Sequence, residues 1–463
     1  MTLVRGERTN DLDRRIGGTA LAILAVACLA VRLAFVARLP GSTGYDAYYY
    51  AVQIRALIER GTLAYRGASL VYGPMALLGA VFGPERAAAV SAAVGGALLP
   101  LAVYGAAREL SRSAWVGLAA AALAARSEVH FVASIELIKN AWALAAYAAF
   151  VGACARADRE PGPRRVAAAA IWGVAAVGSH ASTAPLVAIL GAAIAAPHLA
   201  RSWRTTARVR AALLAGTLAG ITAFALWGPA AGSRLLRANL SLTPHLCLPD
   251  FATRLEAING PVYALELLVY PVILGAALAA LAIPASRRAL VSSPVAVGLT
   301  ITLAVLLAPV WTCNPMGLFS RLIRMALVPA LLLAAAAAGY ARLSVRRVAS
   351  AAVYSGALLT LPLQLRLPYA RSHPHFEAGR DAIAAVARLV PRDALVLAPH
   401  GWQFFVTYVT RLDAASARPR RTGRPVWILR IRSPMLPPGG AAPRCASSRD
   451  IPLAPGFSLG ECR

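Results

Sequence analysis

Apolar stretches of about the length that crosses a lipid bilayer recur along the first 364 residues, and they constrain the fold more than any other feature. A transmembrane helix needs about 20 consecutive apolar residues. We predict a membrane-spanning helix for each of eleven stretches, which cover residues 16–37, 86–108, 113–127, 137–155, 165–180, 184–200, 211–229, 262–284, 290–311, 324–341 and 348–364. The composition agrees, because 58% of the residues are hydrophobic and only 14% are charged. The sequence therefore predicts an all-α polytopic membrane protein and excludes a disordered chain.

The formal net charge is +27 at pH 7, and a basic excess of that size raises nucleic acid as a partner. The chain is too apolar for a soluble nucleic-acid-binding protein, so we predict no such partner. The arginines concentrate in short segments between apolar stretches, as they do in cytoplasmic loops. These segments fall on one side of the membrane if the short stretch 69–83, which contains Gly73 and Pro74, does not span. If it did, there would be twelve spans and every later arginine-rich loop would lie outside.

We therefore expect a cytoplasmic N-terminus and an extracytoplasmic C-terminus. The basic residues include a single lysine and alanine is heavily used, a bias typical of a GC-rich bacterial genome, which indicates the inner (plasma) membrane of a bacterium. The predicted parts are a cytoplasmic segment (1–15), a transmembrane domain (16–364) with its first outer loop at 38–85, a small extracytoplasmic α/β domain (365–432) and a Pro/Gly-rich tail (433–463).

The α/β domain is predicted from a helical pattern at about 376–390 and strand-like runs at 394–398 and 425–431. The tail after residue 433 is rich in Pro and Gly, so we assign it no regular structure. Outside the cytoplasm an oxidising compartment allows disulfides. Cys247–Cys313 and Cys445–Cys462 are candidate pairs that the spacing does not decide.

The first outer loop contains the most informative segment of the chain. Residues 45–60 form an amphipathic pattern with three consecutive tyrosines, which is typical of a helix that lies in the membrane interface. Asp46 opens this helix and lies on the same face as Gln53 and Arg60. Its carboxylate is either an N-cap, the structural alternative, or a functional group at the mouth of the membrane domain.

Further candidate residues come from the later outer segments. Glu128, with Glu136 as the alternative acid, lies in the second outer loop, and Lys139 follows just inside the next span, where it either snorkels to the surface or holds a phosphate. His180 lies beside two hydroxyl residues in a tiny third loop and is either a turn residue or a substrate ligand. Arg321 and Arg324 are three residues apart at an outer helix start; guanidinium groups there suit phosphate or snorkel at the interface.

Together these features resemble the GT-C superfamily of integral membrane glycosyltransferases, which includes oligosaccharyltransferase catalytic subunits, protein mannosyltransferases and bacterial lipid A aminoarabinose transferases. The resemblance covers residues 16–341. It rests on an acid after the first span, the interfacial helix that follows, a short Pro-containing apolar stretch, an acid in the second outer loop and a late arginine. The matching residues are Tyr45-Asp46-Ala47-Tyr48-Tyr49-Tyr50, Leu70-Val71-Tyr72-Gly73-Pro74, Glu128, Arg321 and Arg324.

The resemblance implies transfer of a sugar from a polyprenyl-phosphate carrier, with inversion, to an envelope acceptor that it does not identify. By position, Asp46 would be the base or a ligand of a divalent cation such as Mg²⁺ or Mn²⁺, and Glu128 the second acid. Arg321 or Arg324 would match the residue that holds the carrier phosphate. The positive charge of Lys139 makes it a further candidate for that contact. The sequence lacks the Asp-Glu pair of mannosyltransferases and the Trp-Trp-Asp motif of oligosaccharyltransferases, so it does not indicate a subfamily or a protein acceptor.

Two other functions fit a polytopic membrane protein: a transporter or flippase of lipid-linked sugars, and a non-catalytic subunit of envelope assembly. Transporters usually carry polar groups at the midplane and related halves. Here the candidate residues gather at one predicted boundary and no internal repeat is visible, while Arg32 is the only charge deep in the first span. These features favour an enzyme.

Overall fold

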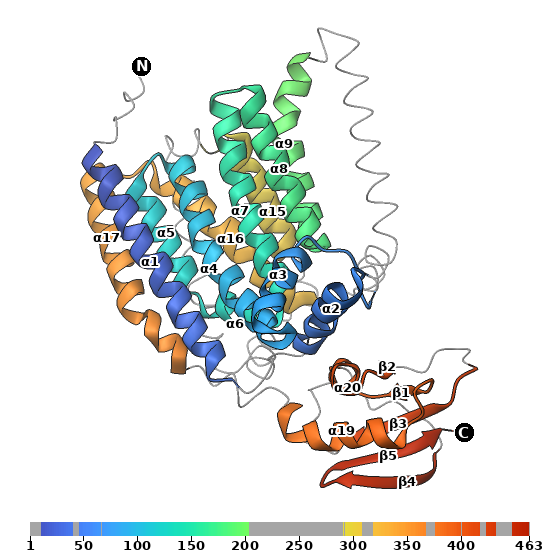
Figure 1. Ribbon diagram of the computed structural model, residues 1–463. Coiled ribbons are helices and arrows are strands. Elements are labelled where there is room, and N and C mark those ends of the chain that lie inside the picture. Colours follow the sequence, from blue (N-terminus) through green and yellow to red (C-terminus); the bar gives the residue numbers. More distant parts are fainter. Residues whose placement is uncertain are drawn as a thin grey trace, which may run out of the picture. The chain divides into compact units, whose positions relative to one another are not determined.

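The computed structural model describes residues 11–39, 46–65, 67–202, 290, 292–307, 318–366, 376–399, 401–416, 423–431 and 447–462. These residues are mainly helical, with one five-stranded sheet near the C-terminus (Figure 1). They divide into two compact units. The first unit comprises Met1–Leu24, Leu99–His130 and Ala143–Leu358, and the second comprises Ala25–Leu98, Phe131–Trp142 and Leu359–Arg463.

The described helices of the membrane domain follow the apolar stretches of the sequence. They are α1 (Asp11–Ala37), α2 (Ala47–Arg60), α3 (Tyr72–Phe82), α4 (Pro84–Ser111), α5 (Ala114–Arg126), α6 (Glu128–Glu136), α7 (Ile138–Arg159), α8 (Pro163–Ser179), the 3₁₀ turn η1 (Ala181–Thr183), α9 (Ala184–Ser202), α15 (Pro294–Leu307), α16 (Leu318–Ala338), α17 (Leu343–Thr360) and the 3₁₀ turn η3 (Leu361–Arg366).

Four described segments are long and apolar enough to cross a membrane: Gly17–Ala37, Pro84–Ser111, Ile138–Arg159 and Leu343–Arg366. A fifth forms if α5 and α6, which meet at a 57° bend, make one broken span. The predicted number of eleven is therefore not confirmed. The stretches 211–229 and 262–284 lie outside the described residues. Helices α8, α9, α15 and α16 coincide with further predicted stretches, but over the described residues they do not reach the length and hydropathy of a span.

The stretch 69–83 contains only a short helix, α3. Its eleven residues rise about 16 Å at 1.5 Å each, which is about half of the hydrocarbon thickness of a bilayer. One face of α3 packs closely on α2, because a Cβ added at Gly79 would lie 2.5 Å from Ile54 Cγ2. This length agrees with the prediction that the stretch does not span.

The segment between 127 and 137, predicted as an outer loop, contains a short helix, α6, that the sequence analysis did not predict. Ser127 ends α5, and its Oγ accepts a hydrogen bond from the His130 backbone N–H at 3.0 Å, which caps the new helix. Phe131, Val132 and Ile135 on this helix are buried. Nine residues are too few to give a clear helical period in the sequence, but burial of this apolar face stabilises the helix in the fold.

Small residues bring the helices of the first unit close together. A Cβ added at Gly152 of α7 would lie 3.0 Å from the Cα of Ala106 on α4, and one at Gly298 of α15 would lie 3.2 Å from the Cα of Leu190 on α9. Glycine and alanine at such contacts let helix backbones approach, which is the usual basis of helix packing in membranes.

The C-terminal part of the second unit is an α/β domain whose sheet has the strand order β2-β1-β3-β5-β4. Its elements are η4 (Phe376–Gly379), α19 (Arg380–Leu389), β1 (Leu395–Leu397), α20 (Trp402–Thr410), β2 (Asp413–Ala415), β3 (Val426–Ile431), β4 (Ser447–Ala454) and β5 (Phe457–Cys462). Strand β1 pairs in parallel with β2 and β3, and the pairs β3–β5 and β4–β5 are antiparallel. The helix and the two strands expected from the sequence are present.

The predicted tail does not lack structure, because β4 and β5 belong to this sheet. They form a hairpin through Pro455 and Gly456, and Gly456 has a φ of 82°, a left-handed conformation that glycine adopts without strain. The Pro and Gly residues that suggested a tail thus mark a turn at this position. Cys462 of β5 is disulfide-bonded, while Cys247, Cys313 and Cys445 lie outside the described residues.

Helix α2 packs onto the α/β domain within the second unit. Tyr48 and Ala51 belong to the same buried core as Phe376, Trp402 and Phe405. The Tyr48 ring lies 4.5 Å from the ring of Phe405 and 5.3 Å from that of Phe376. One face of the predicted interfacial helix is therefore a protein core rather than a lipid contact.

Candidate functional site

Asp46 lies at the N-cap position of α2, as the sequence predicted. Its backbone C=O accepts a hydrogen bond from the Tyr50 N–H at 3.1 Å, which begins the helix. Its side chain makes no capping hydrogen bond, and its backbone is not extended (φ −97°, ψ 2°), whereas a side-chain cap normally needs the extended region. The Asp46 carboxylate is half-buried and does not serve as a structural cap.

Lys139, the single lysine of the chain, is surrounded by tyrosine rings, and two of these tyrosines lie one helical turn after Asp46. The Lys139 Nζ lies 5.2 Å from the ring centre of Tyr49, 5.9 Å from that of Tyr50 and 5.5 Å from that of Tyr72. It also donates to the Tyr72 hydroxyl at 3.4 Å. An ammonium group over aromatic faces is stabilised by the ring quadrupoles. Lys139 is thus a half-buried cation that the fold holds in a defined position.

Hydrogen bonds fix the tyrosines of this cage. Tyr72 donates to the Tyr49 hydroxyl at 3.0 Å, and the fully buried Gln53 donates to the same hydroxyl at 3.2 Å. Gln53 also donates to the Tyr65 carbonyl and accepts from the Tyr65 N–H, which ties the segment after α2 to the helix. Burial, followed by the neighbouring Tyr49, raises the pKa of Tyr72 well above its ordinary value, so its hydroxyl stays protonated.

A second polar cluster near the start of α4 was not predicted from the sequence. Tyr48 donates to Glu85 Oε1 at 3.0 Å, and Arg380 Nη2 lies 3.3 Å from the same oxygen. Glu85 lies in a Gly-Pro-Glu-Arg sequence, and from the sequence it is an ordinary acidic residue in the first turn of a helix. Its partner Arg380 is almost 300 residues away along the chain, and no local signal links the two.

Glu128 is the first residue of α6, next to the break after α5. Its Oε1 lies 2.9 Å from Arg126 Nη1, and both side chains are mostly buried, with 17% and 25% exposure. The alternative acid, Glu136, ends the same helix. Glu128 is therefore a paired carboxylate in a protein environment and not a solvated first-turn residue.

His180 ends α8 and begins the turn η1. Its Nδ1 accepts a hydrogen bond from the Ser182 N–H at 3.1 Å and lies 2.6 Å from Ser182 Oγ. Because Nδ1 accepts from the backbone, the proton of the neutral ring lies on Nε2. These contacts correspond to the turn alternative of the sequence analysis.

Arg321 and Arg324 both lie in the first two turns of α16, as predicted, but the side chain of Arg321 lies outside the described part of the structure. The side chain of Arg324 is only 6% exposed. A guanidinium buried to this extent does not snorkel to the interface, so the snorkelling alternative is wrong for Arg324.

Arg32, the charge deep in α1, is also buried, with 1% exposure. It donates to Ser134 Oγ at 2.5 Å and to Cys28 Sγ at 3.3 Å, and its guanidinium carbon lies 4.8 Å from the ring centre of Phe131. These contacts make it a polar link between α1 and α6.

The predicted site residues fall in both compact units. Asp46 and Lys139 belong to the second unit, and Glu128, His180, Arg321 and Arg324 belong to the first. Within the second unit, the fold brings Lys139 next to the helix that Asp46 begins. Among the residues that the structure describes, no three His, Cys, Asp or Glu side chains gather as metal ligands, and a divalent cation at Asp46 stays a prediction.

Comparison with solved structures finds the same fold in membrane glycosyltransferases. The oligosaccharyltransferase of Archaeoglobus fulgidus in its apo form matches 86% of this chain with a TM-score of 0.56 and 15% identity, and the match spans 64% of that enzyme. ArnT from Cupriavidus metallidurans bound to undecaprenyl phosphate matches 96% of this chain and 98% of its own, with a TM-score of 0.56 and 14% identity. Apo ArnT gives a TM-score of 0.57 at 12% identity over the same shares of the two chains.

The chain therefore has the fold of the GT-C membrane glycosyltransferases, and the resemblance predicted from the sequence is confirmed at the level of the fold. No protein-family model matches the sequence, and a comparison of the sequence with curated proteins finds no significant match.

Proposed function

We propose that this protein is a membrane glycosyltransferase that moves a sugar from a polyprenyl-phosphate carrier to an envelope acceptor on the outer face of the membrane. The observation that supports this most strongly is the shared fold with ArnT, which extends over nearly the whole of both chains. The ArnT structure is bound to undecaprenyl phosphate, and a carrier of that class is the donor we propose here.

In the proposed reaction, an acceptor hydroxyl attacks the anomeric carbon of the sugar. The C–O bond to the carrier phosphate breaks, and inversion follows from direct displacement. Asp46 takes the hydroxyl proton, because a carboxylate in the first outer loop, where the sequence resemblance expects the base, can accept it from an attacking hydroxyl. The carrier phosphate leaves with an additional negative charge.

Positive charge near that phosphate stabilises it as the bond breaks. Lys139 suits this role, because an ammonium has three N–H donors and Tyr72 engages one of them. Arg321 and Arg324 stay candidates for a phosphate contact, as the sequence resemblance implies, while Glu128 and His180 stay candidates for substrate contacts.

The decisive test is Asp46→Asn in membranes supplied with polyprenyl-phosphate-linked sugars, with transfer to the endogenous acceptor and release of free polyprenyl phosphate as readouts. We expect both to fall about 100-fold or more, as is typical for loss of a general base. The matched control is Glu59→Gln, which removes an exposed acid from the far end of the same helix and should leave transfer unchanged. Full activity of Asp46→Asn at a normal protein level would contradict the assignment.

The acceptor can be identified by mass analysis of envelope glycans and glycolipids in a deletion strain. The proposal expects one class of envelope molecule to lack a sugar and the lipid-linked donor to accumulate. If the deletion strain instead lacks the lipid-linked sugar only on the outer face, and its membranes still transfer sugar, the result would support a flippase.

A further inference from the structure

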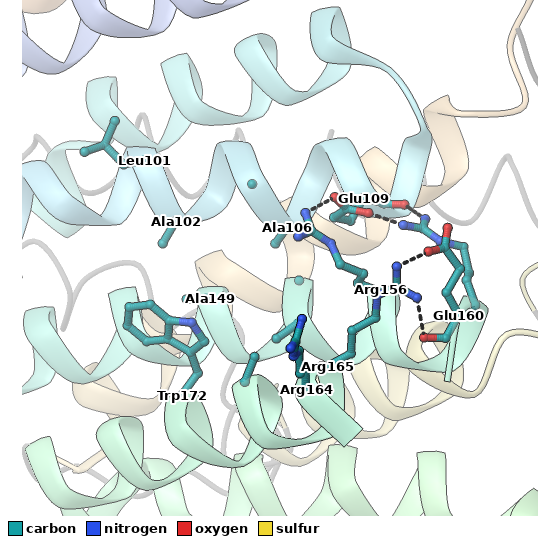
Figure 2. Close-up of a pocket in the computed structure, with 15 residues that line it drawn as sticks. Leu101, Ala102, Ala106, Glu109, Ala149, Arg156, Glu160, Arg164, Arg165 and Trp172 are labelled. Atoms are coloured by element: carbon teal, nitrogen blue, oxygen red, sulfur yellow. Dashed lines mark hydrogen bonds and ion pairs between the residues drawn. The ribbon is translucent and has the colours of Figure 1, made fainter. Parts of the chain in front are cut away.

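A cavity of about 710 Å³ lies in the first unit, between the C-terminal ends of α4 and α7 and the N-terminal part of α8 (Figure 2). It lies at the arginine-rich ends of these helices, and none of the candidate residues of the proposed transfer site lines it. Its volume is in the range of small-molecule sites in proteins.

The lining of this cavity is amphipathic. Arg156, Arg159, Arg164 and Arg165 contribute positive charge against two acids, Glu109 and Glu160. The remaining wall is apolar and is made by small residues of α4 and α7 together with Leu101 and Trp172. A ligand that fits such a wall carries a negative group at one end and an apolar body.

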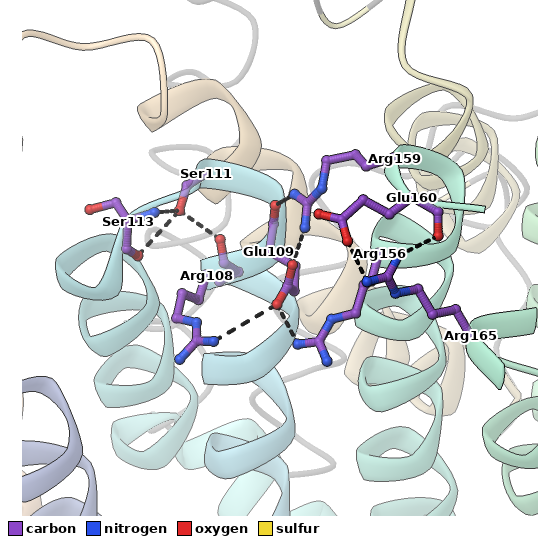
Figure 3. Close-up of polar contacts among 9 residues, drawn as sticks. Arg108, Glu109, Ser111, Ser113, Arg156, Arg159, Glu160 and Arg165 are labelled. Atoms are coloured by element: carbon purple, nitrogen blue, oxygen red, sulfur yellow. Dashed lines mark hydrogen bonds and ion pairs between the residues drawn. The ribbon is translucent and has the colours of Figure 1, made fainter. Parts of the chain in front are cut away.

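Both acids of the lining form ion pairs with arginines of the same lining. Glu109 accepts from Arg156 Nη2 at 2.5 Å and is also paired with Arg159, and Glu160 is paired with Arg165 (Figure 3). Arg164 also lines the cavity and has no ion-pair partner among the residues that the structure describes. The lining therefore has an uncompensated positive charge.

Apolar side chains next to the cavity are exposed. Trp172 is 44% exposed and Leu101 36%, and on α8 the neighbouring Ile171 and Val174 are 66% and 68% exposed. Exposed apolar side chains on a helix of a polytopic membrane protein face lipid chains. The cavity thus combines a guanidinium group with a lipid-facing apolar wall.

We propose that this cavity binds an anionic phospholipid, with its phosphate at Arg164 and Arg165 and its acyl chains along Leu101 and Trp172. Basic pockets between membrane helices on the cytoplasmic side suit anionic headgroups, and guanidinium groups bind phosphate oxygens through paired N–H donors. The site is independent of the proposed transfer reaction, and it assigns a lipid contact to the arginine-rich ends of α7 and α8.

The test uses Trp172 as a reporter in the full-length protein reconstituted in phosphatidylcholine vesicles. Phosphatidylglycerol with brominated acyl chains is added as a minor component, and brominated phosphatidylcholine is the reference. The fluorescence of Trp172 is taken as the difference between the wild type and Trp172→Phe. We expect brominated phosphatidylglycerol to quench this signal at a lower mole fraction than brominated phosphatidylcholine does.

Three variants decide the outcome. Arg164→Gln/Arg165→Gln should weaken the preference for phosphatidylglycerol about fivefold for each arginine removed. Arg342→Gln/Arg347→Gln removes the same charge from exposed arginines outside the cavity and should leave the preference unchanged. Gly105→Leu fills the cavity without changing its charge, since nothing lies within 4 Å of a Cβ added there, and should abolish the preference.

Equal quenching by the two brominated lipids in the wild type would overturn the proposal. An equal loss of preference in both double arginine variants would also overturn it, because the effect would then reflect net charge rather than this cavity. Displacement of phosphatidylglycerol by inorganic phosphate would overturn the assignment of a lipid in favour of a soluble anion.

Discussion

At the scale of single residues, three consecutive tyrosines show that neighbouring residues of one type can have different roles. The sequence predicts the run Tyr48-Tyr49-Tyr50 as interface anchors. In the fold, Tyr48 points into the core of the α/β domain, whereas Tyr49 and Tyr50 face Lys139. Tyr72 completes the cage from another helix, and its raised pKa keeps its hydroxyl neutral next to the cation.

Tyr72 should make the stability of the protein fall in alkaline solution. Above pH 10, about the ordinary tyrosine pKa, the unfolded chain loses the Tyr72 proton while the folded chain keeps it. The folded state then binds more protons, so the free energy of unfolding falls as pH rises, by up to about 1.4 kcal/mol per pH unit. Thermal unfolding of the detergent-purified protein between pH 9 and 11, about the range that brackets this pKa, should show a shallower decline for Tyr72→Phe.

The matched control is Tyr340→Phe, because Tyr340 is 54% exposed. Its decline should follow that of the wild type. The same slope for Tyr72→Phe and the wild type would show that the Tyr72 proton does not contribute.

At the scale of elements, the contact between α4 and α7 depends on a residue with no side chain. Gly152 brings α7 against the backbone of α4 at Ala106. In lipid, apolar side chains gain little from leaving the solvent, so close backbone packing must supply the stabilisation. Glycine and alanine therefore have a structural role at this contact.

Gly152→Ala should destabilise the first unit, because the new Cβ would lie 3.0 Å from Ala106 Cα and a backbone atom cannot move aside cheaply. Overpacking of this kind costs about 1–3 kcal/mol. The control is Gly356→Ala in α17, where nothing lies within 4 Å of the added Cβ and helix propensity favours alanine. Thermal unfolding in detergent should show a lower Tm for Gly152→Ala and an unchanged or higher Tm for Gly356→Ala.

At the scale of the whole molecule, the distribution of arginines predicts that the α/β domain lies outside the cytoplasm, and a disulfide at Cys462 is compatible with that prediction. Positive charge marks the cytoplasmic side, and disulfides persist outside it. Cys28 and Cys154, which lie within candidate spans, are free and buried, whereas Cys462 of the α/β domain is disulfide-bonded.

A reporter fused after the α/β domain tests this sidedness. Alkaline phosphatase, which needs an oxidising compartment to form its disulfides, should be active in such a fusion. A fluorescent protein that becomes fluorescent only in the cytoplasm should give no signal, or be poorly expressed, when it is fused at the same position. The opposite pair of results would place the α/β domain in the cytoplasm and restore the twelve-span alternative.

The sequence predicted the elements that depend on local pattern and missed those that depend on distant contacts. Long uninterrupted apolar runs gave α1, α4 and α7. Helix α6 was read as a loop because its apolar face becomes visible only when it packs against other helices. The hairpin β4–β5 was missed because its strands pair with each other and with β3 across the sheet.

The candidate site shows the same division. Asp46 and Lys139 were singled out from their charge and position alone. The tyrosine cage around Lys139 combines residues from 49 to 139, and the cluster of Tyr48, Glu85 and Arg380 joins residues that are still further apart. No periodicity or motif in a single sequence predicts such contacts between residues that are far apart along the chain.

The shared core of α2 and the α/β domain has a consequence for biosynthesis. Tyr48, two residues after Asp46, packs against Phe376 and Phe405, which the ribosome adds more than 300 residues later. Domains generally fold in order from the N-terminus during synthesis, but here the helix that follows the proposed base reaches its final packing only after the α/β domain has been made. A nascent or truncated chain that is already inserted in the membrane would therefore hold the proposed base without the packing that fixes its helix.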